Sequence, residues 1–163
     1  MTRFRKFAVV AGVLALSLSV TDGAFAKQVK RKADLAYSLS VFNDICLSTA
    51  PNFTNAKKRA AKYGFGKYIS LGKGIIGSSP DESMNIQITP GMECAMGNAF
   101  LGGRNVFPAF VKLVASRAKK MPNPLPIKPP FTALVGSQTL IFHLDRHGGD
   151  TFVIINPKGV PKK

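Results

Sequence analysis

The chain has 163 residues, a formal net charge of +15 and a hydrophobic content of 45%. This length is enough to bury a single core, and it argues for one domain rather than several. Tryptophan is absent and only three tyrosines are present, so the composition disfavours a nucleic-acid partner, because single-stranded nucleic acids bind to stacked aromatic side chains.

Residues 1–26 have the layout of a secretory signal peptide. Three basic residues precede an apolar run over 7–20, and the small residues Ala24 and Ala26 follow it. The run is shorter than the about 20 residues that a membrane-spanning helix needs, and no later segment is apolar enough to cross a membrane. We therefore expect cleavage after Ala26 and a periplasmic or secreted protein of a Gram-negative bacterium.

The rest of the chain divides into a folded part and two basic tails. Residues 27–33 are expected to be a basic flexible tail, and 158–163 are a second basic tail. Between them, 34–157 is expected to form a single α+β domain. The leader carries only three of the 23 basic residues, so the processed chain stays strongly basic.

An aspartate followed by apolar residues at helical spacing predicts the first helix. Asp34 is a suitable N-cap, because its carboxylate can accept from the first free backbone N–H groups. The apolar residues after it recur at spacings of three and four: Leu35, Leu39, Phe42, Ile45 and Cys46. We expect this helical face to pack into the core.

The two cysteines, Cys46 and Cys94, are predicted to form a disulfide. Export takes the chain to an oxidising compartment, where paired cysteines are oxidised. The bond would tie the first helix to the second strand of a hairpin over 83–100, which turns at Pro90-Gly91. A redox or nucleophilic role is disfavoured, because there is no CxxC motif and apolar neighbours would raise the pKa of Cys46.

The second helix is expected over 51–63, with Pro51 in its first turn and Gly64 as its left-handed cap. It carries the densest basic cluster of the folded part: Lys57, Lys58, Arg59 and Lys62. Such a cluster is ordinarily a solvated helix face. In a protein this basic, it is also the candidate binding surface.

Residues 67–71 predict a strand, and the glycine-rich stretch over 72–77 follows it. Its sequence, GKGIIG, matches the spacing of the dinucleotide-binding fingerprint. That motif requires a helix to open at its last glycine, whereas a turn over 78–82 is expected here. We therefore expect a flexible loop between antiparallel strands and no cofactor.

A third helix and a proline-rich segment come next. Asn105 can cap a helix with a wide apolar stripe that reaches Ala118, and basic residues crowd its C-terminal end. The segment 121–131, MPNPLPIKPPF, has five prolines and is expected to be extended. A stiff crossover over the domain is the favoured role, and a ligand for an aromatic-lined groove is the alternative.

The last predicted element is a hairpin of strands over 132–146 and 151–156, with Gly148-Gly149 at its tip. In this register Leu144 faces Val153, and Phe142 faces Ile155. The elements together predict an α+β fold of order ααβββαββ. Two N-terminal helices would lie on an antiparallel sheet of about five strands, with the third helix as a crossover and one disulfide.

The same hairpin carries the only candidate metal site. His143, Asp145 and His147 alternate along the strand, so their side chains would share one face, with Asp150 across the turn. Two imidazoles and a carboxylate can hold zinc and leave a position open for water. The motif is too short to be specific, and we assign no metal to it.

No spacing of carboxylates, serines or lysines matches a catalytic motif. We predict a non-catalytic binding protein that docks on an envelope protein or on an anionic envelope surface, such as lipid head groups or lipopolysaccharide. Two alternatives stay open. One is a periplasmic inhibitor or immunity-type protein that blocks a partner enzyme with a rigid loop such as 121–131. The other is a metal-dependent hydrolase that uses His143, Asp145 and His147.

Overall fold

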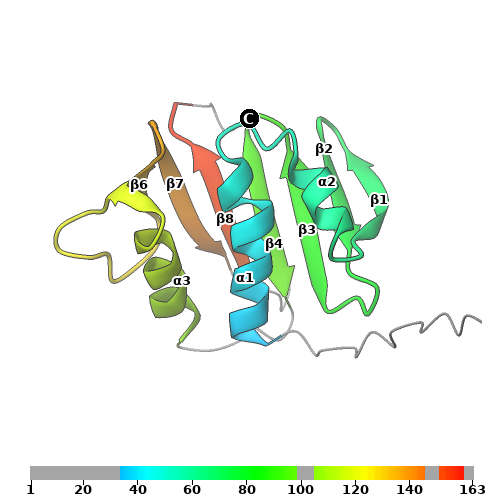
Figure 1. The fold of residues 1–163 in the computed structure, drawn as a ribbon, viewed down its shortest axis with the longest axis horizontal. Helices are drawn as coiled ribbons and strands as arrows, with labels where there is room; N and C mark the ends of the chain where they lie inside the picture. Colours follow the sequence, from blue (N-terminus) through cyan, green and yellow to red (C-terminus); the bar gives the residue numbers. More distant parts are fainter. Residues whose placement is uncertain (1–33, 99–104, 146–150, 160–163) are drawn as a thin grey trace, which may run out of the picture.

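The computed structural model describes residues 34–98, 105–145 and 151–159. In these ranges the chain forms three α-helices and one antiparallel sheet of eight strands (Figure 1). The helices are α1 (Leu35–Ile45), α2 (Ala56–Ala61) and α3 (Val106–Ala115), and a 3-10 turn, η1 (Leu47–Thr49), follows α1. The strands are β1 (Gly66–Leu71), β2 (Gly74–Ser78), β3 (Met84–Thr89), β4 (Glu93–Asn98), β5 (Ala118–Lys120), β6 (Phe131–Val135), β7 (Gln138–Asp145) and β8 (Thr151–Pro157).

The sheet consists of two four-stranded meanders that meet at its centre. The strand order is β1-β2-β3-β4-β8-β7-β6-β5, so β4 and β8 pair in the middle and β1 and β5 form the edges. Helix α2 directly precedes the first meander, and α3 directly precedes the second. The segment with α3 therefore carries the chain from the centre to the far edge, and the second meander brings it back.

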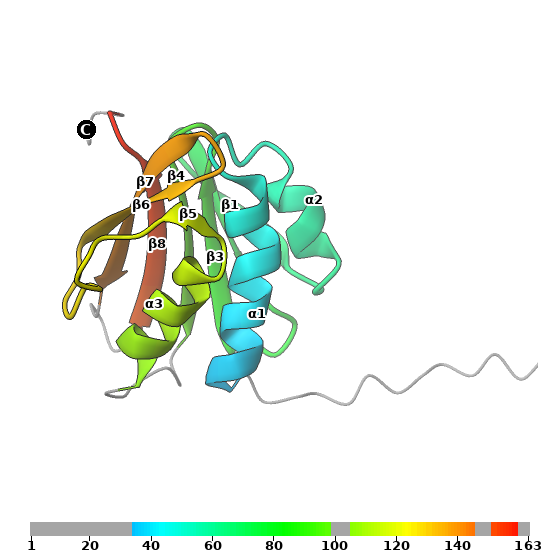
Figure 2. The same cartoon turned by 60° about the vertical axis from the view of Figure 1, so that its left-hand side comes forward.

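All three helices cover the same face of the sheet (Figure 2). The strands alternate accordingly: on β3, Met84, Ile86 and Ile88 are buried beneath the helices, while the residues between them are half-exposed. Strand β7 shows the same alternation, with Leu140 and Phe142 buried. Such alternation is typical of an antiparallel sheet with its core on one side.

Helix α1 forms as the sequence predicts. The Asp34 carboxylate accepts a hydrogen bond from the Tyr37 N–H at 2.7 Å and so caps the helix. Leu39, Phe42 and Ile45 are buried against the sheet. The spacing of the apolar residues thus orients the helix, and the cap sets where it begins.

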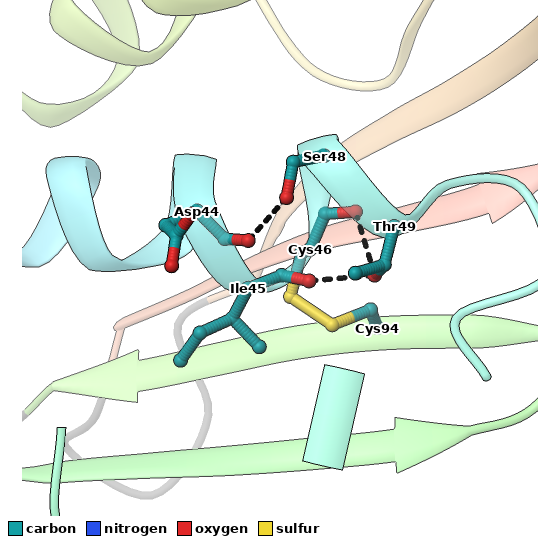
Figure 3. Close-up of a disulfide and its surroundings, with 6 residues drawn as sticks. All are labelled: Asp44, Ile45, Cys46, Ser48, Thr49 and Cys94. Carbon is teal, nitrogen blue, oxygen red and sulfur yellow. Dashed lines mark hydrogen bonds between the residues drawn. A yellow bond between two sulfur atoms is a disulfide. The ribbon is translucent and has the colours of Figure 1, made fainter. Parts of the chain in front are cut away.

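The predicted disulfide between Cys46 and Cys94 is confirmed. It joins the C-terminal end of α1 to the central strand β4 (Figure 3), and both cysteines are fully buried. Two hydroxyls satisfy the last carbonyls of the helix: Ser48 donates to the Asp44 carbonyl, and Thr49 donates to the Ile45 carbonyl at 2.6 Å. The end of α1 is therefore both crosslinked and capped by side chains.

A cluster of phenylalanines holds α3 and the second meander to α1. The Phe110 ring lies edge-on to the rings of Phe42, Phe131 and Phe142, with centroids 5.6 to 5.9 Å apart. Phe131 and Phe142 stack at 5.2 Å across β6 and β7. Edge-to-face and stacked pairs of this kind add to the free energy gained by burying the rings.

The predicted sheet of about five strands and the order ααβββαββ are wrong. One missed strand is β2, which was expected to be a flexible loop over 72–77. Two glycines of β2 lie where a larger side chain would not fit. A Cβ at Gly77 would lie 2.5 Å from the Tyr68 ring, and a Cβ at Gly74 would clash with the Thr89 hydroxyl oxygen. The glycines therefore mark close contact within a sheet rather than flexibility.

Two further strands arise where the prediction placed a longer element. The single strand expected over 132–146 is split into β6 and β7 by a tight turn, in which Gly136 has a φ of 63°. Helix α3 ends at Ala115, where the Ser116 hydroxyl donates to the Leu113 carbonyl at 2.7 Å. The residues expected to complete the helix instead form β5, which pairs with β6.

Two other segments differ from the expected elements. The second helix covers only 56–61, because the residues before it form a loop that accepts a hydrogen bond at the Asn52 carbonyl from the Gly91 N–H at 2.7 Å. Gly64 adopts the predicted left-handed conformation, with a φ of 79°. The proline-rich segment connects β5 to its neighbour β6, so it is the loop of a hairpin and does not cross the domain.

The register of the last hairpin is confirmed, since Leu144 pairs with Val153 and Phe142 with Ile155. Its tip lies outside the described residues. The same is true of 1–33, so the signal peptide and the first basic tail stay predictions. Among the helices of the described ranges, none has the length and apolar character that crossing a membrane would require.

The disulfide should dominate the resistance to unfolding. Replacing both cysteines, Cys46→Ala with Cys94→Ala, should lower the free energy of unfolding by about 4 kcal/mol, because the unfolded chain loses a crosslink over a separation of 48 residues. Urea unfolding followed by circular dichroism measures the difference. A reducing agent should destabilise the wild type and leave the double variant unchanged. Equal stability of the oxidised wild type and the variant would contradict this role.

Candidate functional site

Each carboxylate of the described residues has an interaction partner. Asp34 caps α1, Asp44 pairs with Arg59, and Glu82 lies 3.7 Å from the Lys67 ammonium. Glu93 accepts from Gln87 at 3.0 Å and from Asn156 at 3.2 Å. Asp145 is not without a partner either, and Asp81 accepts hydrogen bonds from two serines. The negative charge is therefore partly neutralised by neighbours in the fold.

Asp81 organises the turn between β2 and β3. Its carboxylate accepts from the Ser79 hydroxyl at 2.7 Å, from the Ser83 hydroxyl at 2.9 Å and from the Ser83 N–H at 3.2 Å. The hydrogen bonds from Ser79 and then from Ser83 lower the pKa of Asp81 below its ordinary value of 3.8, because they favour the charged form. Asp81 is thus a structural anion.

Most lysines have no oppositely charged partner among the described residues. Nine lysines of the described ranges are exposed and have no carboxylate within 4.0 Å there. They are Lys57, Lys58, Lys62, Lys73, Lys112, Lys119, Lys120, Lys128 and Lys158. Most of the exposed lysines therefore lack an acidic partner among the described residues, whereas each carboxylate described there has a contact.

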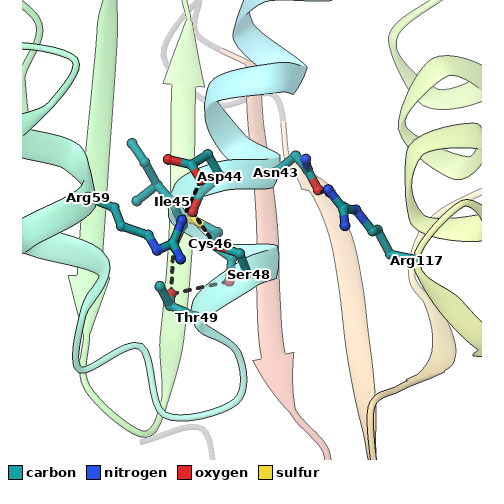
Figure 4. A network of polar contacts seen from close by, with 8 residues as sticks. All are labelled: Asn43, Asp44, Ile45, Cys46, Ser48, Thr49, Arg59 and Arg117. Atoms are coloured by element: carbon teal, nitrogen blue, oxygen red, sulfur yellow. Dashed lines mark hydrogen bonds and ion pairs between the residues drawn. The ribbon is translucent and has the colours of Figure 1, made fainter.

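The four residues predicted as a binding cluster do not behave alike. Lys57, Lys58 and Lys62 are exposed at α2, as a surface for an anion requires. Arg59 is half-buried and pairs with Asp44 on α1 (Figure 4), so it joins the two helices. Burial and the nearby Asp44 carboxylate raise the pKa of Tyr63 above its ordinary value of 10.0.

Lys57 also borders a shallow pocket at the end of the first meander. Its ammonium lies 4.9 Å from the centroid of the Tyr68 ring, a cation–π contact. The pocket has a volume of about 220 Å³ and is lined by Phe53, Thr54, Lys57, Lys73, Gly74, Ile75, Ile88 and Pro90. Sites for small molecules usually enclose roughly 300 to 1,000 Å³, so this hollow is a modest feature of the surface.

A second group of free lysines lies at the opposite edge of the sheet. Lys119 and Lys120 belong to β5, and Lys128 belongs to the loop that follows it. Two large apolar side chains of this loop, Leu125 and Ile127, are exposed. The loop was recognised in the sequence as proline-rich, but its apolar tip was missed, because a proline run has no alternation that tells inward from outward.

The candidate metal ligands fall partly outside the described residues. His143 and Asp145 are half-buried and lie on the face of β7 opposite Phe142, as the predicted alternation requires. His147 and Asp150 lie outside the described residues. In the part of the chain that the structure describes, no group of three histidine, cysteine, aspartate or glutamate side chains could hold a metal ion.

No protein-family model, no curated protein and no solved structure matches the chain. The inference of function therefore depends on the charges, contacts and exposed residues described above.

Arg59 should contribute to stability more than its neighbours on α2. Arg59→Ala should lower the free energy of unfolding by about 1 kcal/mol, because it breaks an ion pair between two helices. Lys58→Ala, a matched exposed change, should alter the free energy by less than about 0.5 kcal/mol. Urea unfolding of both variants measures this, and Asp44→Ala completes a double-mutant cycle. Equal effects of Arg59→Ala and Lys58→Ala would show that the pair is not structural.

The Asp81 turn should give a pH-dependent contribution to stability. The pKa of Asp81 is lowered by folding, so its stabilisation is complete above the ordinary pKa of 3.8 and is lost as the pH falls through the lower folded-state value. Asp81→Ala should therefore lower the melting temperature at pH 7, and the difference from wild type should shrink toward pH 2. Glu82→Ala, at the next residue, is the control, because the carboxylate that accepts the hydrogen bonds of the turn is that of Asp81. A difference that is constant with pH would refute the assignment.

Proposed function

We propose that this protein is a small, exported, non-catalytic binding protein that docks on an anionic surface of the bacterial envelope. The observation that supports this proposal is the separation of the charges. Nine exposed lysines have no carboxylate partner among the described residues, whereas the carboxylates make contacts within the fold. A protein with this distribution attracts anions over its surface without a deep cavity.

The attraction between several lysines and an anionic membrane is strong enough for docking. Each lysine close to an anionic membrane contributes about 1 kcal/mol, so several acting together give reversible binding. The two groups of lysines, at α2 and at β5, lie toward opposite ends of the sheet, because α2 contacts β3 of the first meander and β5 forms the outer edge of the second. Either end could meet a charged surface while the disulfide-linked centre keeps its shape. No chemical step is required for this function.

The function should be visible as salt-sensitive binding to anionic lipid. The chain as the cell processes it should sediment with vesicles of phosphatidylcholine and phosphatidylglycerol, and not with phosphatidylcholine alone. Binding should be largely lost at 1 M salt, where the screening length falls to about 3 Å. Parallel measurements with lipopolysaccharide determine which envelope anion is preferred.

Three results would overturn this proposal. Equal binding to neutral and anionic vesicles would exclude docking by charge. Binding to neither phosphatidylglycerol vesicles nor lipopolysaccharide would exclude an anionic surface altogether. A salt-resistant complex with one envelope protein, together with that failure, would favour the inhibitor or immunity-type alternative instead.

A further inference from the structure

The loop over 121–130 carries the most exposed large apolar side chain of the described residues. Ile127 is 91% exposed and Leu125 is 55% exposed. Figure 1 shows the loop projecting from the edge of the sheet beside β6, away from α2. Leu125 and Ile127 are separated by one proline and form an apolar tip, which we call the loop tip.

The loop is held at both ends by the core. Met121, at its start, packs against the buried cluster. Phe131, directly after it, is buried and stacks on Phe142 at a centroid distance of 5.2 Å. Both ends of the loop are therefore fixed to the core.

Prolines stiffen the segment between these anchors. They occupy positions 122, 124, 126, 129 and 130, and so flank the loop tip on both sides. Each ring fixes its own φ and restricts the residue before it. Little conformational entropy is left for the loop to lose when the tip becomes buried, which favours binding.

All of the charged residues near the loop tip in the sequence are basic. Lys128 adjoins the tip, and Lys119 and Lys120 precede the loop on β5; all three are exposed. No aspartate or glutamate occurs anywhere from 94 to 144, a range that includes α3 and the strands β5 and β6. The loop tip thus combines an apolar end with positive charge beside it.

We propose that the loop tip inserts into the interfacial region of an anionic lipid bilayer. Leu125 and Ile127 would enter the boundary between head groups and acyl chains, and Lys119, Lys120 and Lys128 would bind the phosphate groups. Apolar side chains next to basic ones are the combination that favours binding to an anionic bilayer. The inference deepens the proposed function and rests on it, because it names the bilayer as the anionic surface.

This assignment also gives the protein an orientation on the membrane. The loop lies at the β5 edge of the sheet, whereas α2 lies over the first meander, toward the β1 edge. A bilayer that contacts the loop tip therefore leaves Lys57, Lys58 and Lys62 at the far end of the molecule. The basic cluster on α2 would then not be the membrane contact.

A single tryptophan at the loop tip tests the insertion directly, because the natural chain has no tryptophan. In the Ile127→Trp variant, vesicles that contain phosphatidylglycerol should shift the indole emission to shorter wavelength, and lipids brominated on their acyl chains should quench it. Leu71→Trp is the matched control: Leu71 is 49% exposed on β1, at the other edge of the sheet. Its emission should be unchanged on binding.

Affinity measurements with serine variants complete the test. Leu125→Ser with Ile127→Ser should weaken binding to anionic vesicles by about tenfold or more, because two apolar side chains lose their transfer to the bilayer. Ile69→Ser with Leu71→Ser removes two exposed apolar side chains on β1 and should change affinity by less than about twofold. Thermal unfolding of each variant confirms that the fold is kept.

The possible outcomes separate the two proposals. If the wild type binds anionic vesicles but the indole at position 127 stays in water and the loop variant binds normally, the insertion is refuted and the proposed function stands. If the wild type binds no anionic vesicle but binds lipopolysaccharide, the insertion is refuted and the proposed function stands. If it binds neither, both are refuted. If Lys57→Ala, Lys58→Ala and Lys62→Ala together abolish binding while the loop variant does not, α2 is the contact and the membrane orientation with the β5 edge toward the bilayer is wrong.

Discussion

The covalent bond between Cys46 and Cys94 fixes the position of α1 on the sheet, and the rest of the structure depends on that position. It holds the end of α1 on β4, the strand along which the two meanders meet. The other helices are attached to α1 from either side: α2 through the ion pair of Arg59 with Asp44, and α3 through the contact of Phe110 with Phe42. A shift of α1 along the sheet would therefore break contacts on both sides at once.

The arrangement of the helices on the sheet, here called the frame, determines where the charged side chains lie. Carboxylates stabilise the frame where backbone donors or cations are close, as at the start of α1, in the turn around Asp81 and beside Arg59. The lysines have long side chains whose ammonium groups stay in water, so they collect on the outside. A basic surface with few free acids is the result, and it favours docking on anions over binding of a small substrate in a cavity.

Sequence reasoning identified part of the candidate site, and the missing part has a physical cause. Lys57, Lys58 and Lys62 are recognisable from their density on one short helix. The use of Arg59 could not be predicted, because its partner Asp44 lies 15 residues away and the pairing depends on how two helices meet. The apolar tip at Ile127 was equally hidden, because its exposure depends on the anchoring of Phe131 in a cluster formed by distant elements.

The sequence by itself determined the features whose causes are local or covalent. Asp34 and the apolar spacing after it define α1, the two cysteines define the crosslink, and alternation around two glycines defines the register of Phe142 with Ile155. Only the tertiary structure decided the number of strands and their order. Strand β2 pairs with β1 and β3, and Gly77 leaves room for the Tyr68 ring beside it, while β5 pairs with β6. A short strand takes its stability from its neighbours, and its own residues do not reveal which neighbours it will have.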